Sequence, residues 1–437
     1  MPMIAVIGGG VAGLTAAIRL AEQGSHVELF EAAPTLGGRT RSFHENTIGE
    51  WCDNGPHLLI GAYSATQALL HDCGAEDNIH WQESLELPLW DKERGHFRLR
   101  PSPLLPLPLS MMIALALLPN HGIKSALALT RLAGRSGNAA GQSVEQWLAR
   151  LHTPTHMLRD LIEPLCLGAM NEYPATAPAL SFQRVLMESF ANHRSARLGW
   201  FTKPLSEALV QPLLDRAKKL GVTIRTGCMV SSVTSHLGGG KLAWGSEAQD
   251  FSKIILTTPA WVSNRLMGID SAVESRPISN IHLWFDKPVH LGNSACQPLV
   301  GGIGTRGQWF FDVSSQMSRA SRFQHIAVVI SADHLEARKE DLIGLATREL
   351  GMICGLTSPL QPIHARVVQE KRATVLTRRA DTAQQHTPEW LIDASERPQP
   401  GDLPATIEAA IRRGEMAANC TPCHSNDTVH PLPSEHA

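Results

Sequence analysis

The sequence predicts an α/β protein in which a Rossmann-like domain, assembled from separate segments, is joined to a discontinuous α+β domain. Two observations lead to this prediction. The chain opens with a strand, a glycine-rich turn, a helix and a second strand, and strand patterns that suit the same sheet recur within residues 205–262 and 370–418. The length of 437 residues is roughly two to three times that of one ordinary domain.

The amino-terminal unit, IAVIGGGVAGLTAAIRLAEQGSHVELFEA, begins with an apolar strand over Ile4–Ile7. Gly8, Gly10 and Gly13 follow in G-x-G-x-x-G spacing, and an amphipathic helix leads to a second strand that ends on Glu31. The first glycine permits a tight turn, the second lets a pyrophosphate approach the backbone, and the third lets helix and strand pack closely. Glu31 is placed to bind an adenosine ribose, so the unit predicts dinucleotide binding.

The loop after the second strand indicates which dinucleotide is bound. Its sequence, AAPTLGGRTRSF, carries Gly38 and Arg39 and resembles the glycine doublet of flavoproteins of the amine oxidase and phytoene desaturase type. The resemblance implies a GR2-type domain that binds FAD, with this loop along the pyrophosphate and the flavin. It also implies that the backbone of Val230 meets the adenine. Without the resemblance, Arg39 could be an ordinary surface charge.

A second flavin motif lies near the carboxyl terminus, in PEWLIDASERPQPGDLPATIEAA. Pro404, Ala405 and Thr406 resemble the Pro-Ala-Thr segment that precedes, in these flavoproteins, a helix aimed at the isoalloxazine ring. The expected Gly-Asp pair upstream is altered, because Asp393 follows an isoleucine and the pair ending on Asp402 lies closer to the proline. Both aspartates are candidates to hold the cofactor, and Asp393 is favoured because it directly follows the apolar strand.

The domain boundaries follow from these motifs. Residues 1–75, 205–262 and 370–418 are expected to form the FAD-binding domain, and residues 76–204 and 263–369 the substrate domain. In the last of these segments, strand-like runs are followed by a helical pattern, which predicts a mixed sheet with helices. The near balance of 39 basic and 41 acidic residues gives no global indication of nucleic-acid binding.

Several short motifs occur in a characteristic order. WCDNGPHLLIGAY, PSPLLPLPLS, SVEQWLA and LIEPLCLGAMNEYPATA are followed by LPATIEAA, and together they resemble the hydroxysqualene dehydroxylase family, also called squalene-associated FAD-dependent desaturases. The resemblance extends to about Ala418. It implies a bacterial enzyme of squalene and hopanoid biosynthesis that converts hydroxysqualene, a C30 isoprenoid, to squalene with hydride from reduced FAD. No second nucleotide motif identifies the electron donor.

The implied reaction needs an acid, because an allylic hydroxyl is a poor leaving group until it is protonated. The candidates are Asp53 and His57, which follow a flavin-proximal segment, and Glu163, which lies in the apolar EPLCLGAMN. Buried polar groups in an apolar tunnel are costly without a purpose or a partner. The alternatives stay open: His57 as a hydrogen-bonded core histidine, and Glu163 as a helix-capping or ion-paired acid. Cys166 and Asn171 are expected to be packing residues.

An apolar run, LLPLPLSMMIALALL, marks the region 101–135. It is shorter than the roughly 20 residues that a spanning helix needs and contains prolines. It is either a buried helix pair or a helical part that lies in the membrane surface and admits a lipid. No export signal is apparent, and the eight cysteines are scattered. We therefore expect a cytoplasmic protein that contacts the inner face of the cytoplasmic membrane.

The carboxyl-terminal segment 419–437 is expected to be a disordered tail. It contains CTPCH, which has the form of a c-type haem attachment site. Haem is not expected there, since neither an export signal nor an enclosing domain accompanies the motif. No metal site is predicted anywhere in the chain.

Two other functions would use the same cofactor domain. The first is oxidation by a carotenoid desaturase or an amine oxidase, and the second is a non-catalytic flavoprotein that carries squalene. An amine oxidase usually needs an aromatic cage at the flavin, and the two tyrosines of this chain offer little for one, although ten tryptophans are present. The dehydroxylase is therefore the favoured interpretation.

Overall fold

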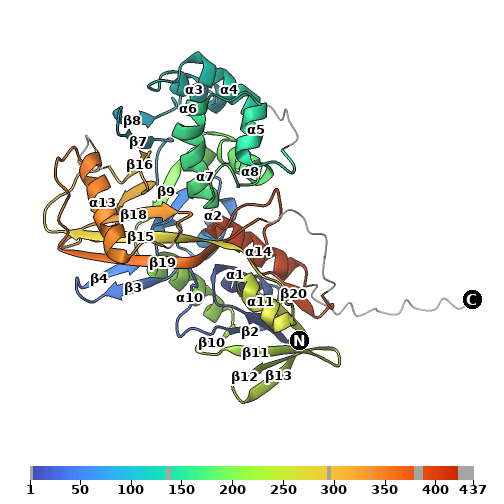
Figure 1. The fold of residues 1–437 in the computed structure, drawn as a ribbon. Coiled ribbons are helices and arrows are strands. Elements are labelled where there is room, and N and C mark those ends of the chain that lie inside the picture. Colours follow the sequence, from blue (N-terminus) through green and yellow to red (C-terminus); the bar gives the residue numbers. More distant parts are fainter. Residues whose placement is uncertain (1–2, 134–138, 293–296, 335, 378–386, 422–437) are drawn as a thin grey trace, which may run out of the picture.

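The computed structural model describes residues 3–133, 139–292, 297–334, 336–377 and 387–421. In this part of the chain the fold has three tiers (Figure 1). A parallel sheet with its covering elements lies at the bottom of the view, a larger mixed sheet crosses the middle, and a group of helices caps the top. Most of the carboxyl-terminal tail, including the end of CTPCH, lies outside the described residues.

The parallel sheet contains the amino-terminal βαβ unit. Strand β1 lies in its middle and pairs in parallel with β2 on one side and β14 on the other. The strands, in order, are β10 (Thr223–Arg225), β2 (His26–Phe30), β1 (Met3–Ile7), β14 (Lys253–Leu256) and β20 (Leu391–Asp393). Because both faces of this sheet are covered, its central strands are continuous apolar runs, such as AVI and IIL.

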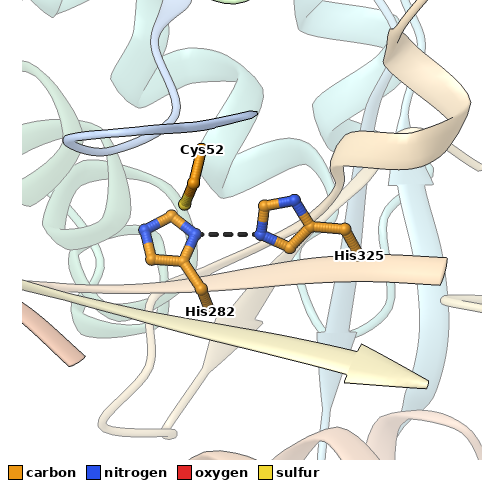
Figure 2. Close-up of side chains that lie close together, drawn as sticks. All are labelled: Cys52, His282 and His325. Atoms are coloured by element: carbon orange, nitrogen blue, oxygen red, sulfur yellow. Dashed lines mark hydrogen bonds between the residues drawn. The ribbon is translucent and has the colours of Figure 1, made fainter. Parts of the chain in front are cut away.

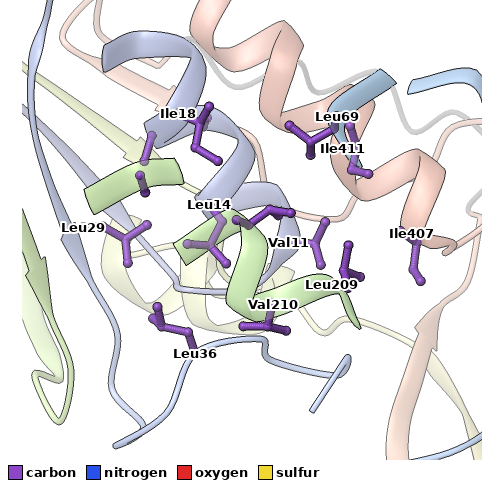
Figure 3. Close-up of a cluster of buried hydrophobic side chains, with 14 of the residues drawn as sticks. Val11, Leu14, Ile18, Leu29, Leu36, Leu69, Leu209, Val210, Ile407 and Ile411 are labelled. Atoms are coloured by element: carbon purple, nitrogen blue, oxygen red, sulfur yellow. The ribbon is translucent and has the colours of Figure 1, made fainter. Parts of the chain in front are cut away.

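Helices cover one face of the parallel sheet, and a small antiparallel sheet covers the other. The elements are α1 (Val11–Glu22), η3 (Ser206–Val210), α10 (Gln211–Lys219) and α14 (Ile407–Asn419) on the helical face, and β11 (Val230–His236), β12 (Gly239–Trp244) and β13 (Glu247–Phe251) on the other. Figure 3 shows the helical face, where Leu14 and Ile18 of α1 pack with Leu29 of β2 and Ile411 of α14. This core holds the amino termini of α1 and α14 in place.

The middle tier is a seven-stranded sheet that is antiparallel except where β16 meets β7. Its order is β19 (His364–Val375), β15 (Ser275–Phe285), β18 (Gln324–Ser331), β17 (Trp309–Asp312), β16 (Leu299–Ile303), β7 (Leu87–Asp91) and β8 (Gly95–Leu99). Helix α13 (Lys339–Ile353) packs on it through Leu342, Ala346 and Leu350. The short helices α11 (Ala260–Met267) and α12 (Val313–Gln316) follow β14 and β17. The sheet combines strands from residues 263–369 with β7 and β8. Strand β19 continues to Val375, beyond residue 370, where the sequence places the start of an FAD-binding segment, because its pairing with β15 extends that far.

The helical cap is the top tier. It contains α3 (Leu107–Ala116), α4 (Ile123–Ala133), α5 (Val144–Arg150), α6 (Thr155–Met157), the π-helical η2 (Leu158–Ile162), α7 (Glu163–Met170), α8 (Ala179–Ser189) and α9 (His193–Ala196). The buried rings of Trp147 and Phe182 fill its centre. Helices α3 and α4 pack together and bury Leu115, whereas other leucines on them are exposed. No helix in the described part of the chain combines the length and the apolar character that crossing a bilayer requires.

Short elements connect the tiers. A hairpin of β3 (Ser42–Glu45) and β4 (Glu50–Asp53), in a segment that the sequence assigns to the FAD-binding domain, contacts the seven-stranded sheet, where Arg366 donates to Glu45 at 2.6 Å. A small sheet and two helices follow: β5 (Leu58–Ile60), β9 (Leu198–Phe201), β6 (Ile79–Trp81), α2 (Ser64–Asp72) and η1 (Glu76–Asn78). The DNGPH loop between β4 and β5 is bound on both sides, because Asn54 donates to Arg41 and accepts from Asn280.

Candidate active site

One cavity of about 1360 Å³ runs from the glycine-rich turn after β1 to the helical cap. It exceeds the roughly 300–1,000 Å³ of most small-molecule sites, so it has room for more than one ligand. Its lower part, which we call the cleft, is lined by residues of both predicted flavin motifs. Its upper part, the chamber, is lined mainly by leucine, methionine and aromatic side chains.

The glycine-rich turn forms the floor of the cleft. Gly8 has a φ of +111°, which side chains disfavour, and a Cβ at Gly13 would lie 1.8 Å from the carbonyl oxygen of Gly8. The lack of side chains at Gly8 and Gly13 therefore lets α1 pack closely against the end of β1. At Gly10, which caps α1, an added Cβ would meet no atom of the described chain within 4 Å. The amino terminus of α1 is therefore open to a ligand phosphate.

The glycine doublet lies directly against this turn. The N–H of Gly37 donates to the carbonyl oxygen of Gly9 at 2.9 Å, and a Cβ at Gly38 would lie 3.4 Å from the Cα of Gly10. Gly38 and Arg39 both line the cleft. The two turns together make a backbone-lined concavity of the kind that binds an anionic pyrophosphate.

Glu31 directly follows β2, beside this concavity. Its carboxylate accepts hydrogen bonds from the N–H groups of Gly9 at 2.6 Å and Ala33 at 2.8 Å, and it lines the cleft. These bonds orient the side chain and leave lone pairs for ribose hydroxyls. Val230 is buried at the start of β11 and lines the same cleft. Both positions suit the adenosine half of a dinucleotide.

The carboxyl-terminal motif starts helix α14. Thr406 is the N-cap and accepts the N–H of Ala409 at 3.1 Å. Ala405 and Thr406 line the cavity, and Pro404 directly precedes them. The amino terminus of α14 therefore opens on the cavity, where its partial positive charge favours an electron-rich group.

Neither candidate aspartate is among the residues that line the cavity. Asp393 accepts a hydrogen bond from Arg397 at 2.7 Å, and Asp402 accepts the N–H of Gln399 at 2.8 Å. The carboxylate of this segment that does line the cavity is Glu396. Contact between Asp393 and the cofactor stays a prediction. The position of Glu396 in the cavity lining makes Glu396 the better candidate for that contact.

Charged side chains gather where the glycine doublet approaches α14. Arg39 donates to the carboxylate of Glu396 and to the carbonyl oxygen of Ala373. Arg413 of α14 also lines the cavity, and its Nε is buried without a hydrogen-bond partner among the described residues. Burial lowers the pKa of Arg413, although Glu396 opposes that shift. A buried unpartnered donor is costly, which indicates that a bound group supplies an acceptor here.

The cleft fits FAD on these observations. The paired glycine turns supply backbone N–H groups without side chains in the way, and Gly10 leaves open space at the amino terminus of α1. Arg413 supplies a donor that lacks a partner within the described part of the chain, and the amino terminus of α14 borders the same cavity. A dinucleotide with two phosphates and a polar ring system satisfies all of these groups.

Asp53 is placed outside the cavity lining. Its carboxylate accepts from the hydroxyl of Ser42 at 2.6 Å and from the N–H of Leu205 at 3.0 Å. Burial raises the pKa of Asp53 to about 6. These contacts join the hairpin to the start of η3, so a structural role is favoured over the predicted role in proton transfer.

His57 lines the cavity, and its ring has a defined orientation. Nδ1 lies 2.9 Å from the carbonyl oxygen of Gly55. Since a carbonyl oxygen only accepts, Nδ1 carries the proton and Nε2 of the neutral ring is an acceptor. Burial lowers the pKa of His57, so the neutral ring dominates at neutral pH. Gly55 permits this local packing, because a Cβ there would lie 2.7 Å from the side chain of Asn280.

Glu163 begins α7 but lies outside the cavity lining, whereas its neighbour Leu165 is part of it. Burial raises the pKa of Glu163. The acid of the cap that does line the cavity is Asp160, in η2. Burial would raise the pKa of Asp160, but hydrogen bonds with His121 and Arg94 outweigh it and lower that pKa to about 2. Asp160 is therefore ionised and paired at neutral pH and does not donate a proton.

The surroundings of Cys166 and Asn171 favour the expected packing role, which stays a prediction. Cys166 is fully buried in the core of the cap. Asn171 borders the cavity, yet its amide donates to the Thr374 hydroxyl at 2.8 Å and accepts the N–H of Ala332 at 2.5 Å. These bonds brace the cap against β18 and β19.

The chamber is mainly apolar and is lined by the helical cap and the seven-stranded sheet. Its walls include Met111, Leu115 and Leu129 of α3 and α4, Leu165 of α7, and the rings of Trp309 and Phe311 on β17. These side chains are far apart in the sequence and meet only in the folded protein. An extended hydrocarbon is the chemical class that such a surface accepts.

Three polar residues that line the cavity were not among the candidates predicted from the sequence: Glu396, Arg413 and Asn280. Arg413 carries a usable signal, because it directly precedes the glycine of a helix already matched to the flavin motif. Glu396 lies between Asp393 and Asp402, which match the expected acid of the motif better and were therefore preferred. Asn280 has no local signal, since it lies within a long strand and reaches the cavity only through sheet pairing.

The glycine-lined cleft, the two flavin motifs and the three-tiered fold define a flavin-dependent oxidoreductase. The chain belongs to the family of flavin-containing amine oxidoreductases, whose model matches residues 11–387. It is therefore an FAD-dependent enzyme with an α/β flavoprotein fold.

Within this family the chain is similar to proteins named hydroxysqualene dehydroxylase. The relative from Zymomonas mobilis is 28% identical and the match covers 97% of this chain and all of the relative; for that from Rhodopseudomonas palustris the values are 28%, 95% and 97%. These matches confirm the resemblance drawn from the sequence. The 15-cis-phytoene desaturase of Arabidopsis thaliana is 24% identical over 65% of this chain and 54% of its own length.

Solved structures agree on the fold. An oxidoreductase from Methanosarcina mazei has a TM-score of 0.72 at 16% identity, covering 95% of this chain and 100% of its own. Cyclohexylamine oxidase from Brevibacterium oxydans has a TM-score of 0.67 at 15% identity, with 96% and 98% covered. At these identities the comparison concerns architecture alone.

Proposed function

We propose that this enzyme converts hydroxysqualene to squalene by reductive dehydroxylation, within squalene and hopanoid biosynthesis. The observation that carries the proposal is the continuity of the chamber with the cleft in one cavity. An apolar chain in the chamber would present its allylic carbon at the mouth of the cleft. The names of the full-length relatives supply the particular substrate.

The chain's own residues would hold the cofactor as follows. The glycine turns and Glu31 would bind the adenosine diphosphate half, and Arg39 and Arg413 would lie along the flavin half. When bound and reduced, FAD supplies a hydride. The amino terminus of α14 would stabilise electron density on the flavin ring.

Proton delivery is assigned to His57 in this proposal. The carbon–oxygen bond breaks as the hydroxyl takes a proton and leaves as water, and the carbon receives the hydride. His57 lines the cavity, whereas Asp53 and Glu163 lie outside the lining. Its lowered pKa makes the imidazolium a strong acid that is populated as the pH falls. The hydride step should therefore accelerate at acidic pH, and His57→Gln should remove that dependence.

The apolar walls would protect the allylic cation that forms when water departs. The apolar lining offers few groups that would hold water, and the electron-rich faces of Trp309 and Phe311 can stabilise a nearby positive charge. Asp160 would remain ionised and paired with Arg94, at the cap end of the chamber. Asp160 would therefore transfer no proton.

Membrane contact is proposed for the outer face of the cap. Leu104, Leu117 and Ile123 are 91%, 79% and 73% exposed, and their neighbours Met111 and Leu115 line the chamber. Exposed apolar groups over the wall of a lipid-binding chamber would lie in the membrane interface and shorten the path of the substrate. The protein would then be peripheral on the cytoplasmic membrane.

An anaerobic single-turnover experiment tests the proposal. Enzyme with chemically reduced FAD is mixed with hydroxysqualene, and flavin absorbance and lipid products are followed. Formation of squalene together with flavin reoxidation is the expected result. Desaturation of squalene or phytoene by the oxidised enzyme would instead support a desaturase. The similarity to a phytoene desaturase is the reason for testing this alternative. Absence of flavin redox change with every prenyl lipid would support a carrier.

A further inference from the structure

A buried cluster of one thiol and two imidazoles lies behind the wall of the active site. Cys52 comes from the hairpin strand β4, and His282 and His325 come from the neighbouring strands β15 and β18. One ligand atom from each side chain lies within 4.8 Å of the others. Figure 2 shows Cys52 reaching from the hairpin toward the paired imidazoles. The proposed function makes no use of this cluster.

The polar contacts of the cluster are incomplete. Nδ1 of His282 lies 2.9 Å from Nε2 of His325, and Nε2 of His282 is buried without a partner among the described residues. The thiol of Cys52 makes one weak hydrogen bond, to the carbonyl oxygen of Asp53 at 3.6 Å. All three side chains are at most 4% exposed. Buried polar groups that meet mainly one another are costly unless a further group joins them.

The donor set and its spacing suit a metal ion. Thiolate and imidazole nitrogens are the ligands that Zn²⁺ and Cu⁺ prefer. Bonds of about 2.0–2.3 Å place such ligand atoms roughly 3.3–3.8 Å apart. The facing imidazole nitrogens, 2.9 Å apart, would separate slightly, and the sulfur, which lies within 4.8 Å of them, would approach by up to about an ångström. Burial lowers the pKa of His282 to about 4 and raises the pKa of Cys52. Burial also lowers the pKa of His325, so both imidazoles are neutral and ready to bind, and the thiol must lose a proton.

We propose that Cys52, His282 and His325 form a binding site for a thiolate-seeking metal ion, Cu⁺ or Zn²⁺. Binding releases the thiol proton to solvent and involves no change of oxidation state. With Cu⁺ the three-coordinate complex is neutral. With Zn²⁺ it keeps one positive charge and an open fourth position. The facing charged groups, Glu45 and Arg366, pair with each other at 2.6 Å and nearly cancel.

The position of the site gives it a structural consequence. Strand β4 runs from Cys52 into the DNGPH loop, and β15 places Asn280 two residues before His282. Asn280 in turn donates to the carbonyl oxygen of Asn54 at 3.0 Å. Two residues of a strand span roughly 6.6 Å, which is the distance along β15 from Asn280 in the cavity lining to His282. A bound metal would therefore fix the hairpin to the seven-stranded sheet close to the cavity. This inference does not depend on the identity of the substrate.

Metal titration of the full-length flavoprotein tests the site. Cys420→Ser with Cys423→Ser forms the background, because the tail thiols are a competing site. After chelator treatment, the protein is titrated with Zn²⁺, with Cu⁺ under anaerobic reduction against a chromogenic chelator, and with Co²⁺ as a spectroscopic probe. We expect one equivalent bound, a thiolate-to-cobalt charge-transfer band, and an X-ray absorption spectrum with one sulfur and two nitrogen ligands. The preferred ion decides between Cu⁺ and Zn²⁺.

Matched variants locate the binding. Cys52→Ser and His325→Gln should lose the metal and the charge-transfer band, whereas Cys73→Ser, at a half-buried thiol elsewhere, should keep both. Flavin absorbance and circular dichroism establish that each variant is folded, and the X-ray absorption spectrum needs no variant. Failure of the background protein to bind any of the ions would overturn the proposal. Undiminished binding by folded Cys52→Ser, or a ligand shell without sulfur, would do the same.

Discussion

The cleft and the chamber belong to one cavity but are constructed differently. The cleft is shaped by backbone, at glycines where a side chain would collide with a neighbour or occupy ligand space. The chamber is shaped by side chains that belong to separate helices and strands. A backbone-built surface tolerates almost no substitution, whereas an apolar wall tolerates many residues of similar size. Substitutions in the cleft should therefore have larger effects than those in the chamber.

The largest effect is expected for Gly13→Val. The new Cβ would lie 1.8 Å from the carbonyl oxygen of Gly8 and 2.7 Å from Oγ1 of Thr257, so α1 must separate from β1. We expect a loss of about 3 kcal/mol or more in unfolding free energy, measured by urea denaturation. Gly344→Val is the matched control, since a Cβ there meets no described atom within 4 Å. Equal stability of the two variants would contradict the backbone contact.

Gly10→Val should separate cofactor binding from folding. Its Cβ enters space that is empty of described protein atoms, so the apoprotein should keep its melting temperature. The same side chain would block the approach of the pyrophosphate, and we expect FAD affinity to fall roughly 100-fold, or about 2.7 kcal/mol. Isothermal titration of the apoprotein measures this loss. Tight FAD binding by the variant would place the phosphates elsewhere.

Leu117→Glu with Ile123→Glu tests the outer surface of the cap. Both side chains are more than 70% exposed, so their replacement should leave the melting temperature unchanged. Binding to vesicles of anionic phospholipid should weaken roughly 10-fold or more, because each buried apolar side chain contributes about 1.5–3 kcal/mol. Leu237→Glu, at a site 97% exposed on the β11–β12 turn, is the control. Equal vesicle binding by all variants would exclude the cap as the contact.

Met112→Trp tests the chamber with less expected damage. Met112 lines the cavity from α3, and the larger ring would shorten the space for a long prenyl chain. We expect KM for hydroxysqualene to rise roughly fivefold while FAD affinity stays constant. Met416→Trp, on the exposed face of α14, is the control. A change in FAD affinity without a change in KM would reverse the assignment of cleft and chamber.

The smallest effect concerns the stability contributed by Asp53. Its folded-state pKa of about 6 lies above the ordinary aspartate value of 3.8 because of burial. The folded state thus binds the proton more tightly, and this contribution to stability is complete below pH 3.8 and lost as the pH rises through about 6. Asp53→Asn should flatten the pH dependence of the melting temperature between pH 4 and 7 by roughly 2 °C. An unchanged profile would show that Asp53 is more solvated than its burial implies.

Much of the cleft was predictable because its chemistry is local. The spacing of Gly8, Gly10 and Gly13 reports a turn whose geometry only glycine permits, and Glu31 follows from the length of one helix and one strand. The acid of the second motif was less accessible to sequence reasoning. Asp393 and Asp402 match the motif better than Glu396, but only the packing of the loop decides which carboxylate borders the cavity.

The chamber and the proton donor were the least predictable parts. Glu163 and Leu165 are close neighbours on one helix, yet only Leu165 lines the cavity, and helix rotation is set by contacts with the rest of the cap. Asp160 is an acid in the apolar cap, as a proton donor would be. Its hydrogen-bond partners Arg94 and His121, which keep it ionised, come from other segments of the chain. Long-range pairing of this kind leaves no local pattern.

The sequence by itself determined the α/β fold, the flavin cofactor and the family, because each depends on spacing within short segments where backbone sterics restrict the residue types. Tertiary structure alone decided which polar groups meet the cavity, how far the chamber extends, and that Cys52 lies against His282 and His325. These features depend on sheet order and helix rotation, which arise from the packing of the whole core. Apolar side chains specify that packing collectively, so no single motif encodes it.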